Sequence, residues 1–266
     1  MQAPSPLRLP LFEVVSAAFR LPLQMRKALW PPLQLPLALM FFLQVVGGLM
    51  TVQQSLLGVV GLGLIGLVIT AMIAVPAHQI FIRGELAPGS GGLRWSTRET
   101  GYLGWSIGLP VLVMLLASLV STPLVLIANA TGQPIFAQLA VFIGVLAGIA
   151  VYGRFSMVLP RIALGLSGGL RRAAEVAKGH TWRVGLIGVL FPLIISLIPV
   201  SLQGLLGPLG LPVAALLAMY FSLVQVAALA LVYRWLQEYG EGDAAEGDEA
   251  ETSERLEDLG DDERDQ

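Results

Sequence analysis

Three long stretches of the chain contain no charged side chain. Residues 28–82, 100–153 and 184–233 have no Asp, Glu, Lys or Arg, which gives uncharged tracts of 55, 54 and 50 residues separated by charged segments. A helix that crosses the hydrocarbon core of a bilayer needs about 20 apolar residues, with about 25 as the usual upper limit. Each tract is therefore too long for one crossing and long enough for two crossings joined by a turn.

Turn-forming residues lie near the middle of each tract. They are TVQQS at residues 51–55, NATGQP at residues 129–134, and SLQG at residues 201–204, followed by more Gly and Pro. Such residues supply or fix the backbone angles that turns require. No segment alternates with the period of two residues expected of a membrane strand. The sequence predicts an all-α fold, a polytopic membrane bundle of six transmembrane helices in three hairpins. We expect these helices at residues 33–51, 57–82, 102–127, 135–158, 183–201 and 211–236.

Composition divides the chain into three regions. Residues 1–32 form a proline-rich basic segment, residues 33–236 the transmembrane domain, and residues 237–266 an acidic tail. From Glu238 onward there are fourteen acidic residues and two arginines, whereas the preceding chain has four acidic and fourteen basic residues. The tail has too few apolar side chains to offset the entropy lost on ordering, so we expect it to be disordered.

The N-terminal segment has no uninterrupted apolar run of the kind found in a signal peptide, so we expect no cleaved signal. Between Pro10 and Arg20, several apolar residues share one face of a helix. Such a helix lies either in the headgroup region or against the protein itself. The residues on this face are Leu11, Phe12, Val15, Ala18 and Phe19.

The positions of the basic residues predict the orientation. All sixteen Lys and Arg residues lie in the N-terminal segment, the connectors at residues 83–99 and 154–183, or the C-terminal segment, and the three turns have none. Lys and Arg are retained on the cytoplasmic side of a membrane. We therefore expect a multi-pass protein of the bacterial cytoplasmic (inner) membrane, with both termini and both connectors in the cytoplasm.

The second connector is the most basic one. Residues 170–179 have the pattern of a short amphipathic cytoplasmic helix ending at Gly179, with the charged side chains on one face. Clusters of Lys and Arg beside membrane spans attract anionic lipid. Arg154 lies near the end of the fourth span, where it either serves a function within the membrane or extends its side chain to the headgroups. The candidate contacts with lipid or a partner are Arg154, Arg161, Arg171, Arg172, Lys178 and Arg183.

Polar residues also lie at the end of the second span. His78, Arg83 and Glu85 are candidates for a polar cluster on the cytoplasmic side, in which His78 could titrate or bind a ligand. The alternative is an interfacial histidine hydrogen-bonded to backbone or water. We expect no metal site, because the only other histidine is His180, the chain has no cysteine, and no carboxylate lies within a span.

The fourth span has small residues at every fourth position, Ala140, Gly144 and Gly148. Small residues let helices approach closely in lipid. This face therefore packs either within the monomer or between two copies of a homo-oligomer.

The composition argues against catalysis. Hydrophobic residues make up 55% of the chain and charged residues 13%, and the mean hydropathy is +0.76. The spans contain no acid and base pair, and no nucleophile has a base beside it. We expect no enzymatic activity, no cofactor and no nucleic-acid partner.

Two motifs carry a resemblance to a known family. One is AHQIFIRGE at residues 77–85, followed by RETGYLG at residues 98–104; the other is GRFSMVLP at residues 153–160, followed by GHTWR at residues 179–183. With these motifs the chain resembles uncharacterised bacterial six-helix integral membrane proteins, similar to the membrane domain of glycerophosphoryl diester phosphodiesterases. The resemblance covers residues from about 30 to 236 and departs at Arg83-Gly84, where the family has an apolar pair. It implies an architecture, and it carries over no activity because the soluble catalytic domain is missing from the sequence.

Two functions agree with these features. The first is a non-enzymatic protein that organises the membrane or binds anionic lipid through its basic inner connectors. The second is a transporter or permease for a small neutral solute, whose path would be lined by polar residues of the spans. These polar residues are Gln44, Ser118, Thr122, Gln138, Ser196, Ser222 and Gln225.

Overall fold

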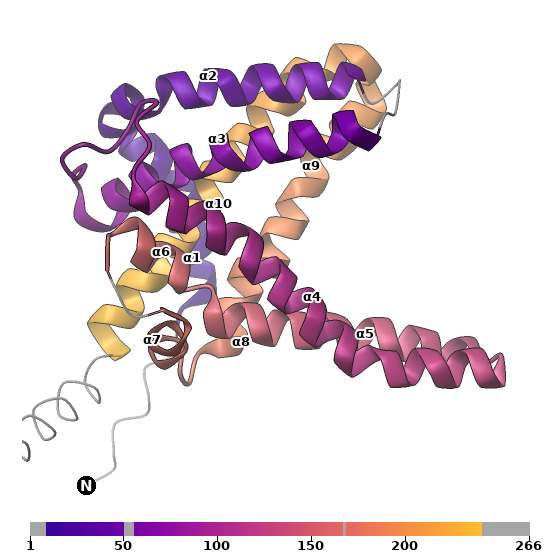
Figure 1. The fold of residues 1–266 in the computed structure, drawn as a ribbon. Helices are drawn as coiled ribbons and strands as arrows, with labels where there is room; N and C mark the ends of the chain where they lie inside the picture. Colours follow the sequence, from indigo (N-terminus) through magenta and orange to yellow (C-terminus); the bar gives the residue numbers. More distant parts are fainter. Residues whose placement is uncertain (1–8, 51–55, 167–168, 241–266) are drawn as a thin grey trace, which may run out of the picture.

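A computed structural model describes residues 9–50, 56–166 and 169–240 of the chain, and all regular structure in these ranges is helical (Figure 1). The expected turn at residues 51–55 and almost all of the acidic tail lie outside the described residues. The longer helices are α1 (Leu11–Gln24), α2 (Arg26–Met50), α3 (Leu56–Arg83), α4 (Thr97–Thr131), α5 (Pro134–Phe155), α9 (Phe191–Leu206) and α10 (Leu211–Gly240). The shorter ones are α6 (Val158–Ala163), α7 (Gly169–Val176), α8 (Thr181–Gly185), the π-helical η2 (Leu186–Leu190) and the 3-10 helix η3 (Gly207–Gly210).

The expected six-span architecture is confirmed. Within the described residues, six helical stretches are long and apolar enough to cross a membrane. They pair as hairpins, with α2 against α3, α4 against α5, and α9 against α10. The stretches are Arg26–Leu49, Val60–Arg83, Thr97–Thr131, Pro134–Ala163, Thr181–Leu206 and Leu211–Tyr239. The chain is therefore a multi-pass membrane protein.

Several helices begin or end outside the expected bounds, each for a local reason. Helix α2 begins at Arg26 rather than at residue 33, although Pro31 and Pro32 lie inside it. A proline removes the hydrogen bond to the carbonyl four residues earlier, and the carbonyls that Pro31 and Pro32 leave without this bond belong to exposed residues of the first turn. Helix α4 begins earlier than expected because Ser96 caps it, and it ends at Gly132, whose φ of 66° is left-handed.

Helix α1 packs on the protein itself. The ring of Phe19 makes edge contacts with Phe191 and Phe221, at centroid distances of 5.8 and 6.3 Å. The Tyr220 hydroxyl of α10 donates a hydrogen bond of 2.5 Å to the Phe19 carbonyl. Of the two alternatives for this segment, the structure shows packing against α10, and the side chain of Phe12 remains 91% exposed.

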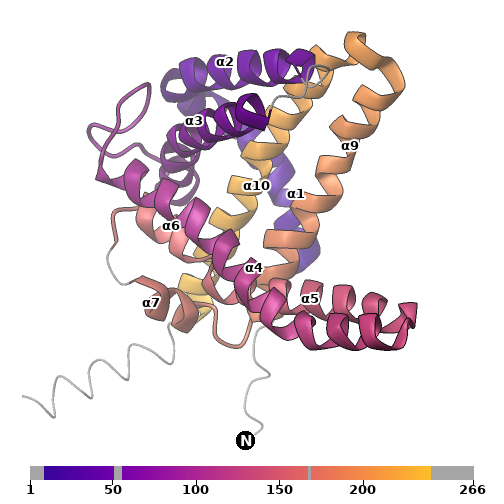
Figure 2. The ribbon, with the colours of Figure 1, turned by 45° about the vertical axis from the view of Figure 1, so that its right-hand side comes forward.

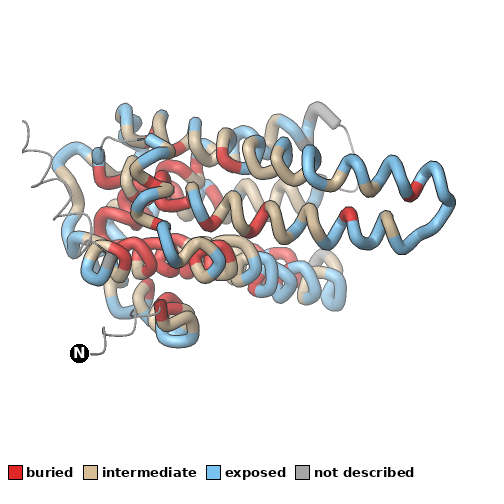
Figure 3. Tube along the Cα trace, turned by 90° about the horizontal axis from the view of Figure 1, so that it is seen from below, coloured by how far each residue is buried: buried red, intermediate tan, exposed pale blue. Residues whose placement is uncertain are grey.

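The core lies between α3 and α10. About half of the most apolar part of each is buried (44% and 50%), against 6% for α4 and 17% for α5. The hairpin of α4 and α5 therefore extends from the core as an arm covered with exposed apolar side chains (Figure 3). In Figures 1 and 2, the α4–α5 hairpin diverges from the other two, whose far ends lie together: a side chain added to Gly48 of α2 would meet Leu211 at the start of α10.

The fifth span is not one continuous α-helix. A π-helical turn, Leu186–Leu190, separates α8 from α9. At this point α8 crosses α5 at close range: a side chain added to Gly153 would meet the Thr181 carbonyl oxygen and would lie 2.7 Å from the Gly185 nitrogen. Glycine at this crossing lets the two backbones touch.

Candidate functional site at the basic end

The common end of the hairpins collects the charged connectors, and we call it the basic end. It comprises the loop at residues 84–96, helices α6 and α7, residues 177–183, the start of α1 and the end of α10 (Figure 1). Hydrogen bonds tie these segments together. The Arg83 guanidinium donates to the Leu164 carbonyl at 3.3 Å, and Arg183 donates to the Leu9 carbonyl at 2.5 Å. Of the thirteen Lys and Arg side chains and five carboxylates in the described residues, seven and four, respectively, lie in these segments, so this end has a net positive charge.

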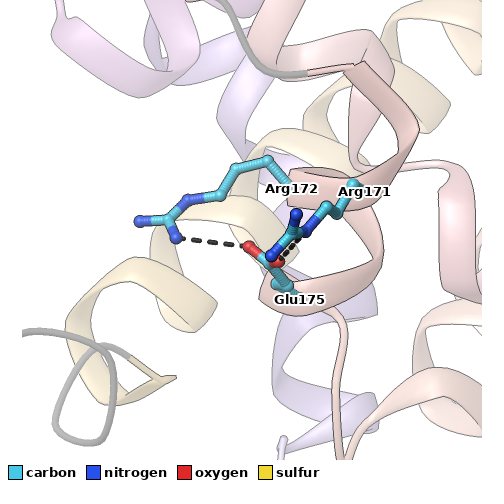
Figure 4. Close-up of polar contacts among 3 residues, drawn as sticks. All are labelled: Arg171, Arg172 and Glu175. Carbon is cyan, nitrogen blue, oxygen red and sulfur yellow. Dashed lines mark hydrogen bonds and ion pairs between the residues drawn. The ribbon is translucent and has the colours of Figure 1, made fainter. Parts of the chain in front are cut away.

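Helix α7 confirms the expected amphipathic helix. Ala173 and Ala177 are buried against the bundle, whereas Arg171 points outward with its side chain 95% exposed. Arg171 and Arg172 both hold the Glu175 carboxylate, at 3.1 and 3.2 Å (Figure 4). These two hydrogen bonds hold the pKa of Glu175 below its usual value, with the Arg171 bond as the larger cause. The carboxylate offsets one of the two positive charges on this face.

The other four candidate cations lie on neighbouring elements. Arg154 and Lys178 are exposed, and Arg161 and Arg183 are half-buried. Arg154 occupies the last turn of α5, which ends at Phe155 before the separate helix α6 begins. Arg154 therefore lies at the end of α5, whereas the apolar helical stretch that contains it continues through α6 to Ala163.

A hollow of about 350 Å³ opens at the start of the fifth span, lined by Gly179, His180, Thr181, Trp182 and Arg183. Burial and, to a smaller extent, the charge of Arg183 lower the pKa of His180. Trp182 is 51% exposed, in keeping with the preference of tryptophan for the membrane interface. The hollow therefore combines a fixed guanidinium with an interfacial ring.

The structure does not bring His78, Arg83 and Glu85 together. Arg83 and Glu85 are exposed, whereas His78 is fully buried beside Tyr102, with 5.9 Å between the ring centroids. Neither ring nitrogen of His78 has a hydrogen-bond partner among the described residues, and the same holds for the hydroxyl of the buried Ser156. The expectation of an interfacial, hydrogen-bonded histidine thus differs from this geometry, because His78 faces α4 inside the bundle.

Two buried polar residues outside the predicted polar cluster, Gln79 and Glu99, hold the basic end together. The Gln79 side chain donates to the Ala163 carbonyl at 2.8 Å and accepts from the Ala87 amide at 3.1 Å, so it joins α3, α6 and the first loop. Glu99 accepts hydrogen bonds from the backbone and hydroxyl of Ser96, which completes a capping box at the start of α4. The spacing S-x-x-E could have revealed the second contact, whereas no local signal marks the first.

The small-residue face of α5 packs within the chain. A side chain added to Gly148 would meet Val113 of α4 at 3.3 Å, and one added to Gly144 would meet Ser121 at 3.7 Å; Ala140 is buried. The structure thus shows the intramolecular packing that the sequence left open for this face. A homo-oligomer through Ala140, Gly144 and Gly148 stays a prediction.

Among the described residues, no group of three or more His, Cys, Asp or Glu side chains could hold a metal ion. The absence of enzymatic activity stays a prediction. Comparisons of the chain with protein-family models, with curated proteins and with solved structures gave no match. The resemblance to the membrane domain of the phosphodiesterases therefore stays a prediction too, and the architecture rests on the chain's own helices.

Proposed function

We propose that this membrane protein binds anionic lipid through its basic end, which lies on the cytoplasmic side, and so organises the lipid around it in the bacterial inner membrane. The observation that carries the proposal is the gathering of basic side chains from connectors distant in sequence at one end of the bundle, while the described hairpin turns have none. Each Lys or Arg beside an anionic membrane surface contributes about 1 kcal/mol of attraction.

The geometry predicts which basic side chains contribute most to lipid binding. Arg171 and Arg172 share the Glu175 carboxylate, so together they offer a lipid phosphate little more than one net charge. Arg154 and Lys178 are exposed on neighbouring elements, and Arg183 contributes to the hollow beside Trp182. We therefore expect Arg154, Lys178 and Arg183 to contribute more per residue than the α7 pair.

The experiment measures binding of short-chain phosphatidylglycerol to the detergent-solubilised full chain by native mass spectrometry. The double variant Arg154→Gln with Lys178→Gln should bind about 30-fold more weakly, which corresponds to about 1 kcal/mol for each lost charge. The control, Arg154→Lys with Lys178→Arg, retains both charges and should bind as wild type does. Equal binding by the charge-removed and control variants would refute the proposal.

The permease alternative has no observation in its favour among the described residues. Several hydroxyls proposed to line a path bond to carbonyls of their own helix: Thr122 to Ser118 at 2.7 Å, Ser196 to Leu193 at 2.7 Å, and Ser222 to Met219 at 2.7 Å. Hydroxyls satisfied in this way need no water-filled path. Transport of a neutral solute stays a prediction, which flux measurements on reconstituted vesicles would test.

A further inference from the structure

A second hollow at the basic end has a different charge pattern. It has a volume of about 250 Å³ and lies between α1 and α10, where Glu13, Arg234 and Glu238 line it together with Trp235. Its remaining walls are apolar, formed by Pro10, Val14, Ala17 and Leu231. We call it the α1–α10 groove. The groove thus has polar and apolar walls side by side, near the end of the last span. Lipid headgroups lie at this depth of a membrane.

The groove concentrates negative charge at an otherwise positive end. Of the five carboxylates in the described residues, Glu99 caps α4 and Glu175 is held by two arginines. Glu85 lies exposed after α3, and the remaining two, Glu13 and Glu238, both line the groove, although they come from opposite ends of the described chain. With Arg234 as the only cation among the lining residues, the groove has two negative charges and one positive charge.

The ion pair inside the groove is weak. Arg234 and Glu238 are 3.9 Å apart at their closest atoms, with side chains 46% and 58% exposed. Exposed pairs of this kind contribute little to stability, so both groups can exchange their contact for a ligand. Trp235 adds an aromatic wall: its ring lies 5.0 Å from the His180 ring and 5.2 Å from the Tyr239 ring. An aromatic face attracts cations, and a primary ammonium also donates hydrogen bonds to carboxylates.

We propose that the α1–α10 groove binds the headgroup of a phospholipid that carries a primary ammonium. Glu13 and Glu238 accept the hydrogen bonds of the ammonium, Arg234 pairs with the phosphate, and Val14, Ala17 and Leu231 contact the first part of the acyl chains. A purely anionic headgroup lacks the charge that the two carboxylates require, and a quaternary ammonium lacks the N–H donors. This site is separate from the anionic-lipid contacts proposed above, and it uses different residues.

The test titrates the detergent-solubilised full chain with short-chain phosphatidylethanolamine, phosphatidylcholine and phosphatidylglycerol, and with soluble phosphoethanolamine. Native mass spectrometry gives each dissociation constant. We expect phosphatidylethanolamine to bind about tenfold or more tightly than phosphatidylcholine, because charged hydrogen bonds distinguish the two headgroups. Similar affinity for these two lipids would overturn the proposal. Phosphoethanolamine should bind at least about tenfold more weakly than the lipid, and equal binding would overturn the assignment to a lipid.

Matched variants locate the site. The double variant Glu13→Gln with Glu238→Gln should lose the preference for phosphatidylethanolamine, and Arg234→Gln should weaken binding of this lipid by about tenfold. Glu85→Gln removes an exposed carboxylate of the same end outside the groove and should leave the preference unchanged. All substituted side chains are exposed, and an unchanged melting temperature confirms folding. If the double variant retains the wild-type preference, the groove is not the binding site.

Discussion

Gln79 gives the most direct test of how the basic end is held together. Its side chain makes two hydrogen bonds, to the Ala163 carbonyl and from the Ala87 amide, and is itself fully buried. Replacing Gln79 by Met retains the length and volume of the side chain but removes both bonds. Leaving a buried polar group without a partner costs about 1–3 kcal/mol. Because Ala87 is only partly buried, water can replace some of its bond, and we expect a total loss of about 2–4 kcal/mol.

The assay for this prediction is equilibrium unfolding of the purified full chain in mixed micelles, which gives the free energy of unfolding. The control is Gln138→Met, because Gln138 is exposed on the α4–α5 arm and its replacement should leave that free energy unchanged or raise it. Hydrogen exchange should also increase in α6, whose end Gln79 binds. If Gln79→Met lowers the free energy of unfolding by less than about 0.5 kcal/mol, the two bonds do not hold this end together.

Three further predictions use the same purified chain. Gly153→Ala should lower the free energy of unfolding by about 3 kcal/mol or more, because the new methyl group would lie 2.7 Å from the Gly185 backbone nitrogen. The control is Gly61→Ala, which has open space around it and should not lower this free energy. His78→Leu should lower the free energy of unfolding by less than about 1 kcal/mol, since neither ring nitrogen has a hydrogen-bond partner among the described residues. A loss above about 2 kcal/mol would show that the imidazole makes a hydrogen bond. Because the folded-state pKa of Glu175 is lowered, its bonds to two arginines are present at neutral pH and are lost as the pH falls through that pKa. Affinity for anionic vesicles should therefore rise more steeply on acidification in the wild type than in Glu175→Gln, and equal pH profiles would contradict this.

The membrane architecture could be predicted from sequence because the signal is long. Uncharged tracts of 50 to 55 residues exceed one bilayer crossing, and turn residues such as Gly132 mark their middles. Helix α7 was predictable for a similar reason, since its charged and apolar positions follow the helical period over the whole segment. In both cases a local or periodic property of the residues determines the structure.

Contacts between distant segments gave no such signal. His78 and Gln79 are adjacent polar residues at the end of one span. His78 faces Tyr102 and has no hydrogen-bond partner in the described part of the chain, whereas Gln79 joins three elements. The direction of each depends on which helix lies beside α3, which is a tertiary property. The α1–α10 groove could not be predicted from sequence for the same reason, since Glu13 and Glu238 line one groove only because α1 packs along α10.

The length of the α4–α5 arm has a consequence for the bilayer itself. Helix α4 has 35 residues and is about 52 Å long at 1.5 Å per residue, whereas the hydrocarbon core is about 30 Å thick. A helix of this length tilts strongly or thickens the lipid around it.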